Sequence, residues 1–389
     1  MIKNMSPKSY DVILIGAGSI GTPLAFYLSR SGLKVLVLDK NASVGQDSNK
    51  KAIGGIRATH SDPAKIRLCL DSIKTFSTWK DNFGDDIEWY RGGYCFVAYH
   101  ENEEQKIKHL IQTQKALGLN INWLNAQELL EIAPDLNPVE LRGGSYSPED
   151  GSASPLLAAY SFYKHATRQG AEFRFNETVT GLKITNNRIT GVTTNHGSYV
   201  SDIVVNAAGA WAGQIASLAG FDLPVTPDAH EAAVTEPVIH FLDPMIVDIR
   251  MFPGSSNFYF YQHATGQFFF CVTPEPKIWG FDTEETSSFL PQAAQRLMHI
   301  MPRLTQIRIR RTWRGLYPMT PDGFPVVGWS KEVQGFFQAA GMCGQGFMLG
   351  PGIGEFATRT ILNQNTAEDE LISEYISPYR SFSKQEMLQ

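Results

Sequence analysis

A chain of 389 residues is long enough for two or three domains of ordinary size. Its net charge of -5 argues against a nucleic-acid-binding protein, and its composition, 43% hydrophobic and 19% charged, is that of a globular enzyme. The first residues lack the apolar core of a signal peptide, and no apolar run reaches the roughly 18 residues of a membrane span. The four cysteines form no CxxC pair, which is typical of free thiols in a reducing compartment. We therefore expect a cytoplasmic protein with no membrane span and no metal site.

The predicted elements begin with a β-α-β unit. Residues 10–15 (YDVILI) form a short, β-branched, apolar run, which predicts a strand buried on both faces. The glycine-rich GAGSIG follows, then a stretch with helical spacing, then a second buried strand ending in Asp39. The order strand, helix, strand predicts parallel strands with a right-handed crossover. Residues 41–62 are polar and contain glycines.

The rest of the chain mixes helical and strand patterns. Helical spacing occurs at six places: residues 64–83, 103–117, 126–132, 156–169, 290–301 and a last stretch that runs to about residue 362. Strand patterns occupy residues 171–211, with an Asn-Asn turn, residues 224–281, with the aromatic hairpin sequence NFYFYQHATGQFFFCV, and residues 307–329. The sequence after residue 362 is polar.

GAGSIG contains the spacing Gly16-x-Gly18-x-x-Gly21 between a buried strand and a helix. Its glycines permit a tight turn and close approach to a pyrophosphate, which a helix N-terminus stabilises. Asp39 is placed where a carboxylate would accept hydrogen bonds from an adenosine ribose. The motif predicts a dinucleotide site, with a tight structural turn as the alternative, and it does not separate FAD from NAD.

Three later tracts add to this motif. NAAGAW, residues 206–211, closes a buried strand with residues small enough to lie beside a ligand, although packing alone could also require them. WRGLY leads into TPDGFPVVG, residues 320–328, in which Asp-Gly is a turn signal. AAGMCGQGFMLGPGIGE, residues 339–355, is either a mobile loop or a backbone that must approach something closely. Its free N–H groups ahead of a helix suit an anion or a polarised carbonyl.

These motifs, in this order, resemble the D-amino acid oxidase-like FAD-dependent oxidoreductases. The chain looks most like the branch of the sarcosine oxidase β-subunit, dye-linked proline dehydrogenase and glycine oxidase, over roughly residues 8–362. The resemblance implies an α/β fold with a Rossmann-like FAD-binding domain and a second, α+β substrate domain built on an antiparallel sheet. It implies a discontinuous FAD-binding domain at residues 1–90, 145–220 and 310–389, and a substrate-binding domain at residues 91–144 and 221–309.

The resemblance also implies which residues contact the cofactor. The pyrophosphate and adenosine would be held by Gly16, Gly18, Ser19, Ile20, Gly21, Asp39, Lys40 and Val179. The diphosphate and the flavin ring would lie along Ser48, Lys50, Gly54, Gly55 and Ile56, and be flanked by Ala207, Ala208, Gly209, Trp211 and Gly315. The pyrimidine edge of the flavin, where negative charge appears on reduction, would meet Gly344, Gln345, Gly346, Phe347 and Met348.

Two departures from the family matter. Some relatives tether the flavin to a cysteine near WRGLY, where this chain has Gly315, and others to a histidine in a tract that here reads NKKAIGG. We therefore expect non-covalent FAD. Glycine oxidases also tend to carry a substrate-binding arginine where this chain has Tyr317, which makes glycine a less favoured substrate.

The candidate catalytic or substrate-binding residues are Arg57, Tyr259, Arg314, Tyr317 and Gln345. An arginine is the usual bidentate partner of a carboxylate. Arg250 is a further candidate for that role, although a solvated strand charge is the favoured interpretation there.

Tyr259 and Tyr261 alternate with Phe258 and Phe260, so the tyrosines and phenylalanines should face opposite sides of a strand. The inward pair is interpreted equally well as the wall of a substrate site or as sheet core.

The expected function is oxidation of the C–N bond of a small amino acid or N-alkyl amino acid of the sarcosine, proline, glycine or D-amino acid type. Hydride transfer to the flavin would give an imine that hydrolyses, with oxygen or another acceptor taking the electrons. The alternatives are a flavin-dependent 2-hydroxy acid dehydrogenase of the same fold and a flavin-bearing, non-catalytic subunit of a larger complex. Partner subunits are therefore possible, and we expect no nucleic-acid partner.

Overall fold

The computed structural model describes residues 8–388, which divide into two compact units. The first contains the chain up to Lys50, Pro155–Thr226 and Pro318–Gln385, and the second contains Lys51–Ser154, Pro227–Tyr317 and the chain from Glu386. The predicted FAD-binding domain also includes residues 51–90, 145–154, 310–317 and 386–388, which the structure groups with the second unit. The predicted substrate domain includes residues 221–226, which belong to the first. Residues 1–7 and 389 of the predicted ranges lie outside the described residues.

The first unit is built on a six-stranded sheet in which β1 lies between β2 and β12. β1, β2, β8, β12 and β19 pair in parallel, and only β18 runs antiparallel, against β19. The predicted β-α-β unit is confirmed, since α1 connects β1 to β2 and every residue of both strands is buried. The strands are β1 (Val12–Ile15), β2 (Val35–Leu38), β8 (Glu172–Arg174), β12 (Val204–Asn206), β18 (Val326–Trp329) and β19 (Phe336–Ala340).

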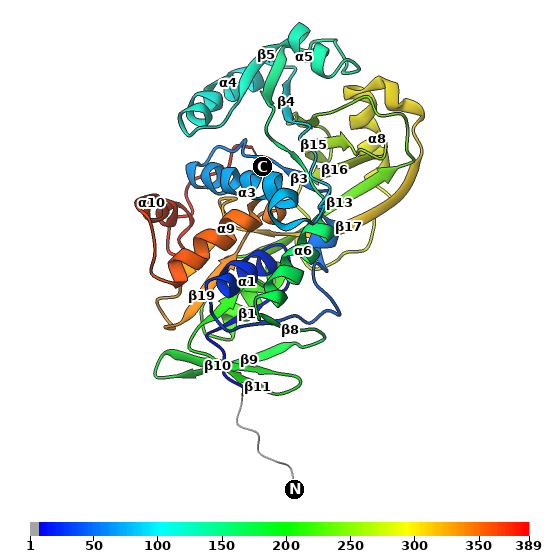
Figure 1. Ribbon diagram of the computed structural model, residues 1–389. Coiled ribbons are helices and arrows are strands. Elements are labelled where there is room, and N and C mark those ends of the chain that lie inside the picture. The colour runs from blue at the N-terminus through cyan, green and yellow to red at the C-terminus, as the bar shows by residue number, and fades with distance from the viewer. Residues whose placement is uncertain (1–7, 389) are drawn as a thin grey trace. The chain divides into compact units, whose positions relative to one another are not determined.

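Helices and a small sheet complete the first unit (Figure 1). α1 packs against both α6 and α9. The helices are α1 (Gly21–Arg30), α2 (Ser48–Lys51), α6 (Pro155–Arg168), η1 (Gly209–Trp211), α7 (Ala212–Ser217), α9 (Gly346–Ile361) and α10 (Ala367–Ile376). The small sheet consists of β9 (Val179–Thr185), β10 (Arg188–Thr194) and β11 (Ser198–Val200), and the predicted Asn-Asn turn joins β9 to β10 with positive φ at both asparagines.

α10 has no counterpart among the predicted elements. The Thr366 hydroxyl oxygen caps the helix by accepting the Asp369 N–H, and the Asp369 carboxylate accepts the Thr366 N–H. Ile372 and Ile376 are its buried apolar residues. The segment looked merely polar because its apolar stripe is this narrow.

The second unit is built on an eight-stranded sheet in the order β17-β13-β16-β15-β14-β4-β6-β5. The predicted aromatic hairpin is confirmed as β15 and β16, and β14 with β4 is a parallel pair. Its strands are β4 (Tyr94–Ala98), β5 (Asn122–Asn125), β6 (Gly143–Ser147), β13 (Thr226–Thr235), β14 (Met245–Asp248), β15 (Ser255–Gln262), β16 (Phe268–Pro274) and β17 (Ile309–Met319). A two-residue ribbon, β3 (Gly55–Ile56) with β7 (Gly151–Ser152), lies outside this sheet.

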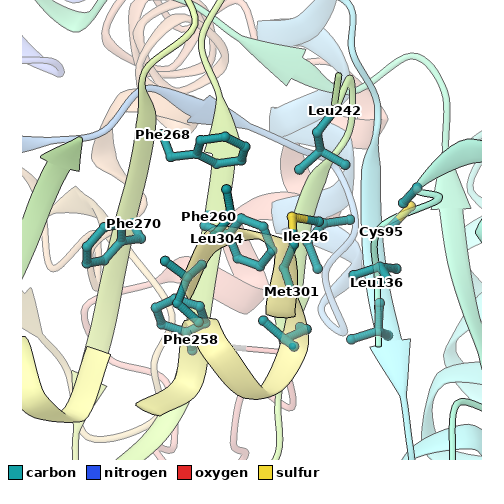
Figure 2. Packing of buried hydrophobic residues seen from close by; sticks show 14 of the residues in the cluster. Cys95, Leu136, Leu242, Ile246, Phe258, Phe260, Phe268, Phe270, Met301 and Leu304 are labelled. Atoms are coloured by element: carbon teal, nitrogen blue, oxygen red, sulfur yellow. The ribbon is translucent and has the colours of Figure 1, made fainter. Parts of the chain in front are cut away.

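One face of the large sheet carries the hydrophobic core. Phe258, Phe260, Phe268 and Phe270 pack there with residues of α8 and of the segment after it (Figure 2). The helices of the unit are α3 (Pro63–Phe83), α4 (Glu101–Ala116), α5 (Ala126–Ile132), α8 (Phe289–Ile300) and η2 (Pro302–Gln306). All six stretches with helical spacing are thus helices in the structure, within two residues at the predicted ends.

Each of the four cysteines is buried, and none forms a disulfide within the described residues. Within residues 8–388, no helix is both long and apolar enough to cross a membrane. In the same residues, no three His, Cys, Asp or Glu side chains are grouped so that they could hold a metal ion.

Candidate functional site

The glycine loop between β1 and α1 combines packing glycines with one glycine that packing does not require. A Cβ on Gly16 would collide with the Ala207 carbonyl oxygen, and one on Gly21 with the Gly16 carbonyl oxygen. Gly16 also has a φ of 112°, which favours glycine. A Cβ on Gly18, in contrast, would meet no heavy atom within 4 Å. The space beside Gly18 fits the pyrophosphate of a dinucleotide.

Asp39 is fastened to the same loop. Its carboxylate accepts the N–H of Ala17 at 2.7 Å and the N–H of Asn41 at 2.8 Å. Burial raises the pKa of Asp39, and these two hydrogen bonds oppose the rise. The Nζ of Lys40 lies 3.0 Å from the centre of the Trp211 ring. The structure therefore places Asp39 against the glycine loop and Lys40 against Trp211. These three residues were assigned to the adenosine end or the flank of the cofactor.

The glycine-rich segment before and within α9 has two separate structural roles. Gly346, Gly350 and Gly354 are spaced four residues apart and face the loop and helix α1. A Cβ on Gly346 would lie 3.1 Å from Ser19 Oγ, one on Gly350 would collide with the Ser19 carbonyl oxygen, and one on Gly354 would lie 3.1 Å from the main chain of Leu24. These glycines let α9 approach α1. Their i, i+4, i+8 spacing was the sequence signal for this packing.

The other glycines shape the turn that precedes α9. Gly341, Cys343 and Gly344 all have positive φ, and α9 begins at Gly346. The N–H groups of a first helical turn point out of the helix end. Gln345 is 6% exposed, and its side-chain Oε1 has no hydrogen-bond partner among the described residues. A buried acceptor beside donor groups fits a ligand edge that carries both N–H and C=O, as the flavin pyrimidine does.

The second unit places tyrosines on the sheet face opposite the phenylalanine core. Phe258 and Phe260 are fully buried in that core, whereas Tyr259 and Tyr261 point the other way, as the alternation predicts. The Tyr261 hydroxyl donates to the carbonyl oxygen of Ile53 at 2.6 Å. The Trp313 indole N–H donates to the carbonyl oxygen of Lys51 at 2.7 Å.

The tract of residues 51–56 is thus anchored to the tyrosine face. A Cβ on Gly55 would collide with the Tyr94 hydroxyl, and one on Gly315 would lie 3.2 Å from Lys51 Cβ. Both glycines leave room for close packing between the tract and the sheet.

Tyr259 and Tyr317 form a hydroxyl pair on this face, with an oxygen–oxygen distance of 2.6 Å. Both residues are half-buried, and burial raises the pKa of each hydroxyl well above its usual value, so both are neutral. The Tyr317 ring stacks on His230 with centroids 3.8 Å apart and an interplanar angle of 14°. Sequence reasoning gave His230 no role. The only local signal was Asp228 two residues earlier in the same strand, whose carboxylate lies 3.0 Å from His230 Nε2.

The three candidate arginines have different surroundings. Arg250 is buried, and its Nε and Nη2 each donate to Asp248 at 2.8 Å. The interpretation of Arg250 as a solvated strand charge is wrong, because Asp248 and the ring of Tyr99 enclose its guanidinium.

Arg314 and Arg57 are also buried. Arg314 Nη1 pairs with Asp282 at 3.1 Å, while its Nε has no partner among the described residues. Strand alternation directs Arg314 to the face opposite Tyr317. Arg57 donates to the carbonyl oxygens of Thr59 and Leu388.

The chain is similar to known proteins over most of its length. A family model described as DAO, FAD dependent oxidoreductase, matches residues 11–360. The crystal structure of L-proline dehydrogenase from P. horikoshii superposes with a TM-score of 0.89 and 31% sequence identity, covering 96% of this chain and 98% of that one. Glycine oxidase from Geobacillus kaustophilus is 26% identical over 92% of this chain and 95% of its own length. Human mitochondrial sarcosine dehydrogenase is 26% identical over 93% of this chain, which spans 41% of that relative.

Proposed function

Because this chain belongs to the DAO family of FAD-dependent oxidoreductases, we propose that it oxidises the C–N bond of a small amino acid that carries a secondary amine. Two of its relatives are named for such substrates, L-proline and sarcosine, and a third for glycine. FAD, when bound, supplies the redox chemistry by accepting hydride from the substrate carbon. The protein's own task is to hold the amino acid in a fixed orientation and exclude water.

The observation that carries this proposal is the Tyr259–Tyr317 pair. Two neutral hydroxyls have two donors between them, and the bond between these hydroxyls uses one. The second O–H has the Cys271 sulfur, 4.0 Å from the Tyr317 oxygen, as a weak partner within the protein, so the pair can offer a substrate one O–H donor and oxygen lone pairs. That combination matches an amino acid, whose carboxylate accepts hydrogen bonds and whose amine donates them. His230 and Asp228 hold the Tyr317 ring from behind.

We propose different roles for Arg314, Arg57 and Gln345. Arg314 leaves β17 on the face opposite Tyr317, so we propose the hydroxyl pair rather than Arg314 as the polar contact of the substrate. Arg57 is proposed as a residue that positions the tract before it, since the chain's own carbonyls already engage its guanidinium. Gln345 is proposed as a cofactor contact, on the strength of its buried, unpartnered Oε1.

We also propose that FAD is held without a covalent bond. Where some relatives have a tethering cysteine, the side chain of Lys51 lies over Gly315, and a Cβ there would already be 3.2 Å from Lys51 Cβ. Acid precipitation should release all of the flavin into the supernatant. Flavin absorbance that stays with the precipitated protein would contradict this.

Anaerobic reduction of the bound flavin tests the substrate assignment. We expect L-proline or sarcosine to bleach the flavin absorbance faster than glycine or D-alanine at equal concentration. Bleaching by lactate or another 2-hydroxy acid, and by no amine, would identify a hydroxy acid dehydrogenase instead. Flavin that no small molecule reduces, in protein that co-purifies with other chains, would indicate a non-catalytic subunit.

A further inference from the structure

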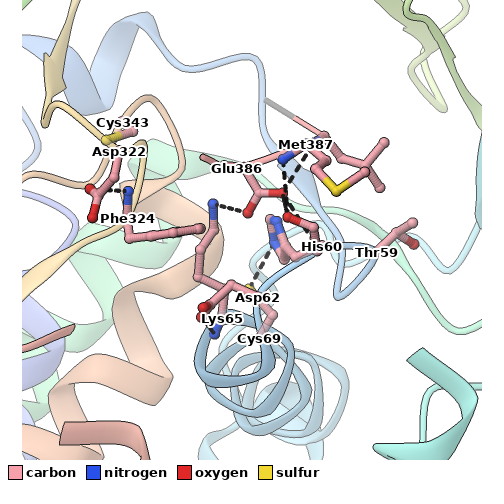
Figure 3. Close-up of polar contacts among 12 residues, drawn as sticks. Thr59, His60, Asp62, Lys65, Cys69, Asp322, Phe324, Cys343, Glu386 and Met387 are labelled. Atoms are coloured by element: carbon pink, nitrogen blue, oxygen red, sulfur yellow. Dashed lines mark hydrogen bonds and ion pairs between the residues drawn. The ribbon is translucent and has the colours of Figure 1, made fainter. Parts of the chain in front are cut away.

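Residues 386–388 are bonded to the segment that links β3 to α3. Lys65 Nζ and the Glu386 carboxylate form an ion pair at 2.7 Å, and both side chains are completely buried (Figure 3). Glu386 also accepts the Ser61 N–H at 3.1 Å and the Ser61 hydroxyl. The Ser61 hydroxyl oxygen in turn accepts the N–H of Met387 at 3.0 Å.

Arg57 is the second point of attachment. One of its terminal nitrogens donates to the carbonyl oxygen of Leu388 at 2.7 Å, and the other lies 3.1 Å from His60 Nδ1. A guanidinium only donates, so Nδ1 of His60 must be an acceptor. The His60 proton is then on Nε2, which lies 3.4 Å from Cys69 Sγ. Burial, together with the charges of Arg57 and Lys65, lowers the pKa of His60, which agrees with a neutral ring.

Glu386 places a negative charge beside two buried cations. Arg57 and Lys65 are two buried cations, and burial alone would raise the pKa of Glu386. The Lys65 ammonium, with the hydrogen bond from Ser61, outweighs burial and holds the pKa of Glu386 well below its usual value. Glu386 is therefore ionised. Its removal would take away the ion pair that Glu386 makes with the buried Lys65 ammonium, and breaking a buried pair is strongly unfavourable.

These bonds act on a buried tract that is also held by the side-chain N–H of Gln114, which donates to the carbonyl oxygen of His60 at 2.8 Å. β3 precedes Arg57 directly and has only two residues, which pair with Gly151 and Ser152 of β7. From the other side, the Asp150 carboxylate accepts the N–H of Ala58 and the hydroxyl of Thr59, both at 3.1 Å. A two-residue ribbon is weak by itself, so residues 57–61 depend on these side-chain contacts.

We propose that residues 386–388 form a clasp that fixes Arg57 and the tract of residues 53–56, and that Glu386 is a positioning residue for that tract. In the clasp, the Glu386 carboxylate lies against the Lys65 ammonium and the N–H and hydroxyl of Ser61. Its effect on cofactor binding rests on the proposed function and on the expectation, from the family resemblance, that Gly54, Gly55 and Ile56 contact the flavin. When the Glu386 side chain is removed, the space that it leaves beside Lys65 and Ser61 should accept a small free carboxylate.

The experiment is chemical rescue of Glu386→Ala in the full-length chain. We expect the variant to bind FAD roughly tenfold more weakly or worse, because small displacements far from a site can be costly. Hydrogen exchange in residues 53–60 of the apoprotein should be faster. Sodium acetate should restore both properties, and sodium chloride at equal ionic strength should not. Glu374→Ala, which removes an exposed glutamate from α10, is the matched control and should behave as wild type.

Two results would overturn the clasp. The first is wild-type FAD affinity and wild-type exchange in Glu386→Ala, which would mean that Glu386 does not position the tract. The second is a defect that acetate does not reverse, or that acetate reverses equally in Glu386→Ala combined with Lys65→Met. Because exchange is measured on apoprotein, the result stands even if no amino acid reduces the flavin, which would count against the proposed function alone.

Discussion

The hydroxyl oxygens of Tyr259 and Tyr317 lie 2.6 Å apart although their strands, β15 and β17, are not neighbours in the sheet. β16 and β13 run between them, and strands are spaced about 4.8 Å apart. The two tyrosines must therefore lean toward each other across both inner strands. Tyr317 stacks on His230 of β13, and Cys271 of β16 pairs in register with Tyr259. The inner strands thus provide the floor beneath the hydroxyl pair.

Tyr317→Phe and Tyr259→Phe should each lower kcat/KM for the best amino acid by about 3- to 10-fold, since a neutral hydrogen bond contributes about 0.5–1.5 kcal/mol. The double variant should lose less than the product of the two effects, because the hydroxyls bond to each other. Steady-state kinetics measures this. Tyr160→Phe, on the exposed side of α6, is the control. Fully multiplicative losses would show that the two hydroxyls act independently.

Gly18→Ala and Gly350→Ala should separate cofactor binding from packing. The first adds a methyl group where no heavy atom lies within 4 Å, so the thermal stability of the apoprotein should be unchanged while FAD affinity falls. The second forces α9 away from the Ser19 carbonyl and should cost on the order of 1–3 kcal/mol of unfolding free energy. Thermal unfolding of apoprotein and FAD titration distinguish them. A destabilised Gly18→Ala apoprotein would show that this glycine serves packing.

Asp150 should make the stability of the protein depend on pH near neutrality. Burial raises its pKa to about 7, against hydrogen bonds from Ala58, Ser147 and Thr59 and the charge of Arg57. Between its unfolded pKa of about 3.9 and this value, the folded state binds more protons than the unfolded state. The free energy of unfolding therefore falls as pH rises to about 7, by up to about 1.4 kcal/mol per pH unit from this group.

Asp150→Asn cannot titrate and removes this dependence. Urea denaturation at several pH values between 5 and 8 should show the wild type losing stability relative to the variant as pH rises. A constant difference between the two proteins across this range would mean that Asp150 is ionised throughout.

Arg250→Met should destabilise the fold without changing substrate recognition. Removing Arg250 leaves the Asp248 carboxylate buried with only the more distant Arg296 at 3.4 Å, and breaking a buried pair costs about 3–5 kcal/mol. Denaturant unfolding should show this loss, and KM of the folded fraction should stay at the wild-type value. Arg310→Ala, at an exposed site in β17, is the control. A raised KM with unchanged stability would restore Arg250 as a substrate clamp.

The sequence was sufficient to predict an element, or the face on which a residue lies, wherever a local pattern of residues determines it. The βαβ order around GAGSIG, the alternation of Tyr259 with Phe258 and the helical spacing of the six helices each depend on residues within one or two elements. Strand alternation and helical periodicity decide which face a residue takes, so these predictions were confirmed. α10 was not predicted, because its buried apolar residues, Ile372 and Ile376, form too narrow a stripe to be recognised in a polar segment.

By itself, then, the sequence determined the β-α-β unit, the six helices with clear spacing, the family and the need for FAD. Only the tertiary structure decided which side chains become partners. Arg57 donates to the carbonyl oxygen of Leu388, 331 positions away in the chain. Tyr317 stacks on His230 and contacts the hydroxyl of Tyr259, which lie on two other strands. Arg250 donates to Asp248 in the interior of the second unit. Local periodicity sets the direction in which a side chain points, but its partner depends on which distant segment packs against that face. The same reason explains the glycines of α9, whose neighbour is Ser19 near the other end of the chain.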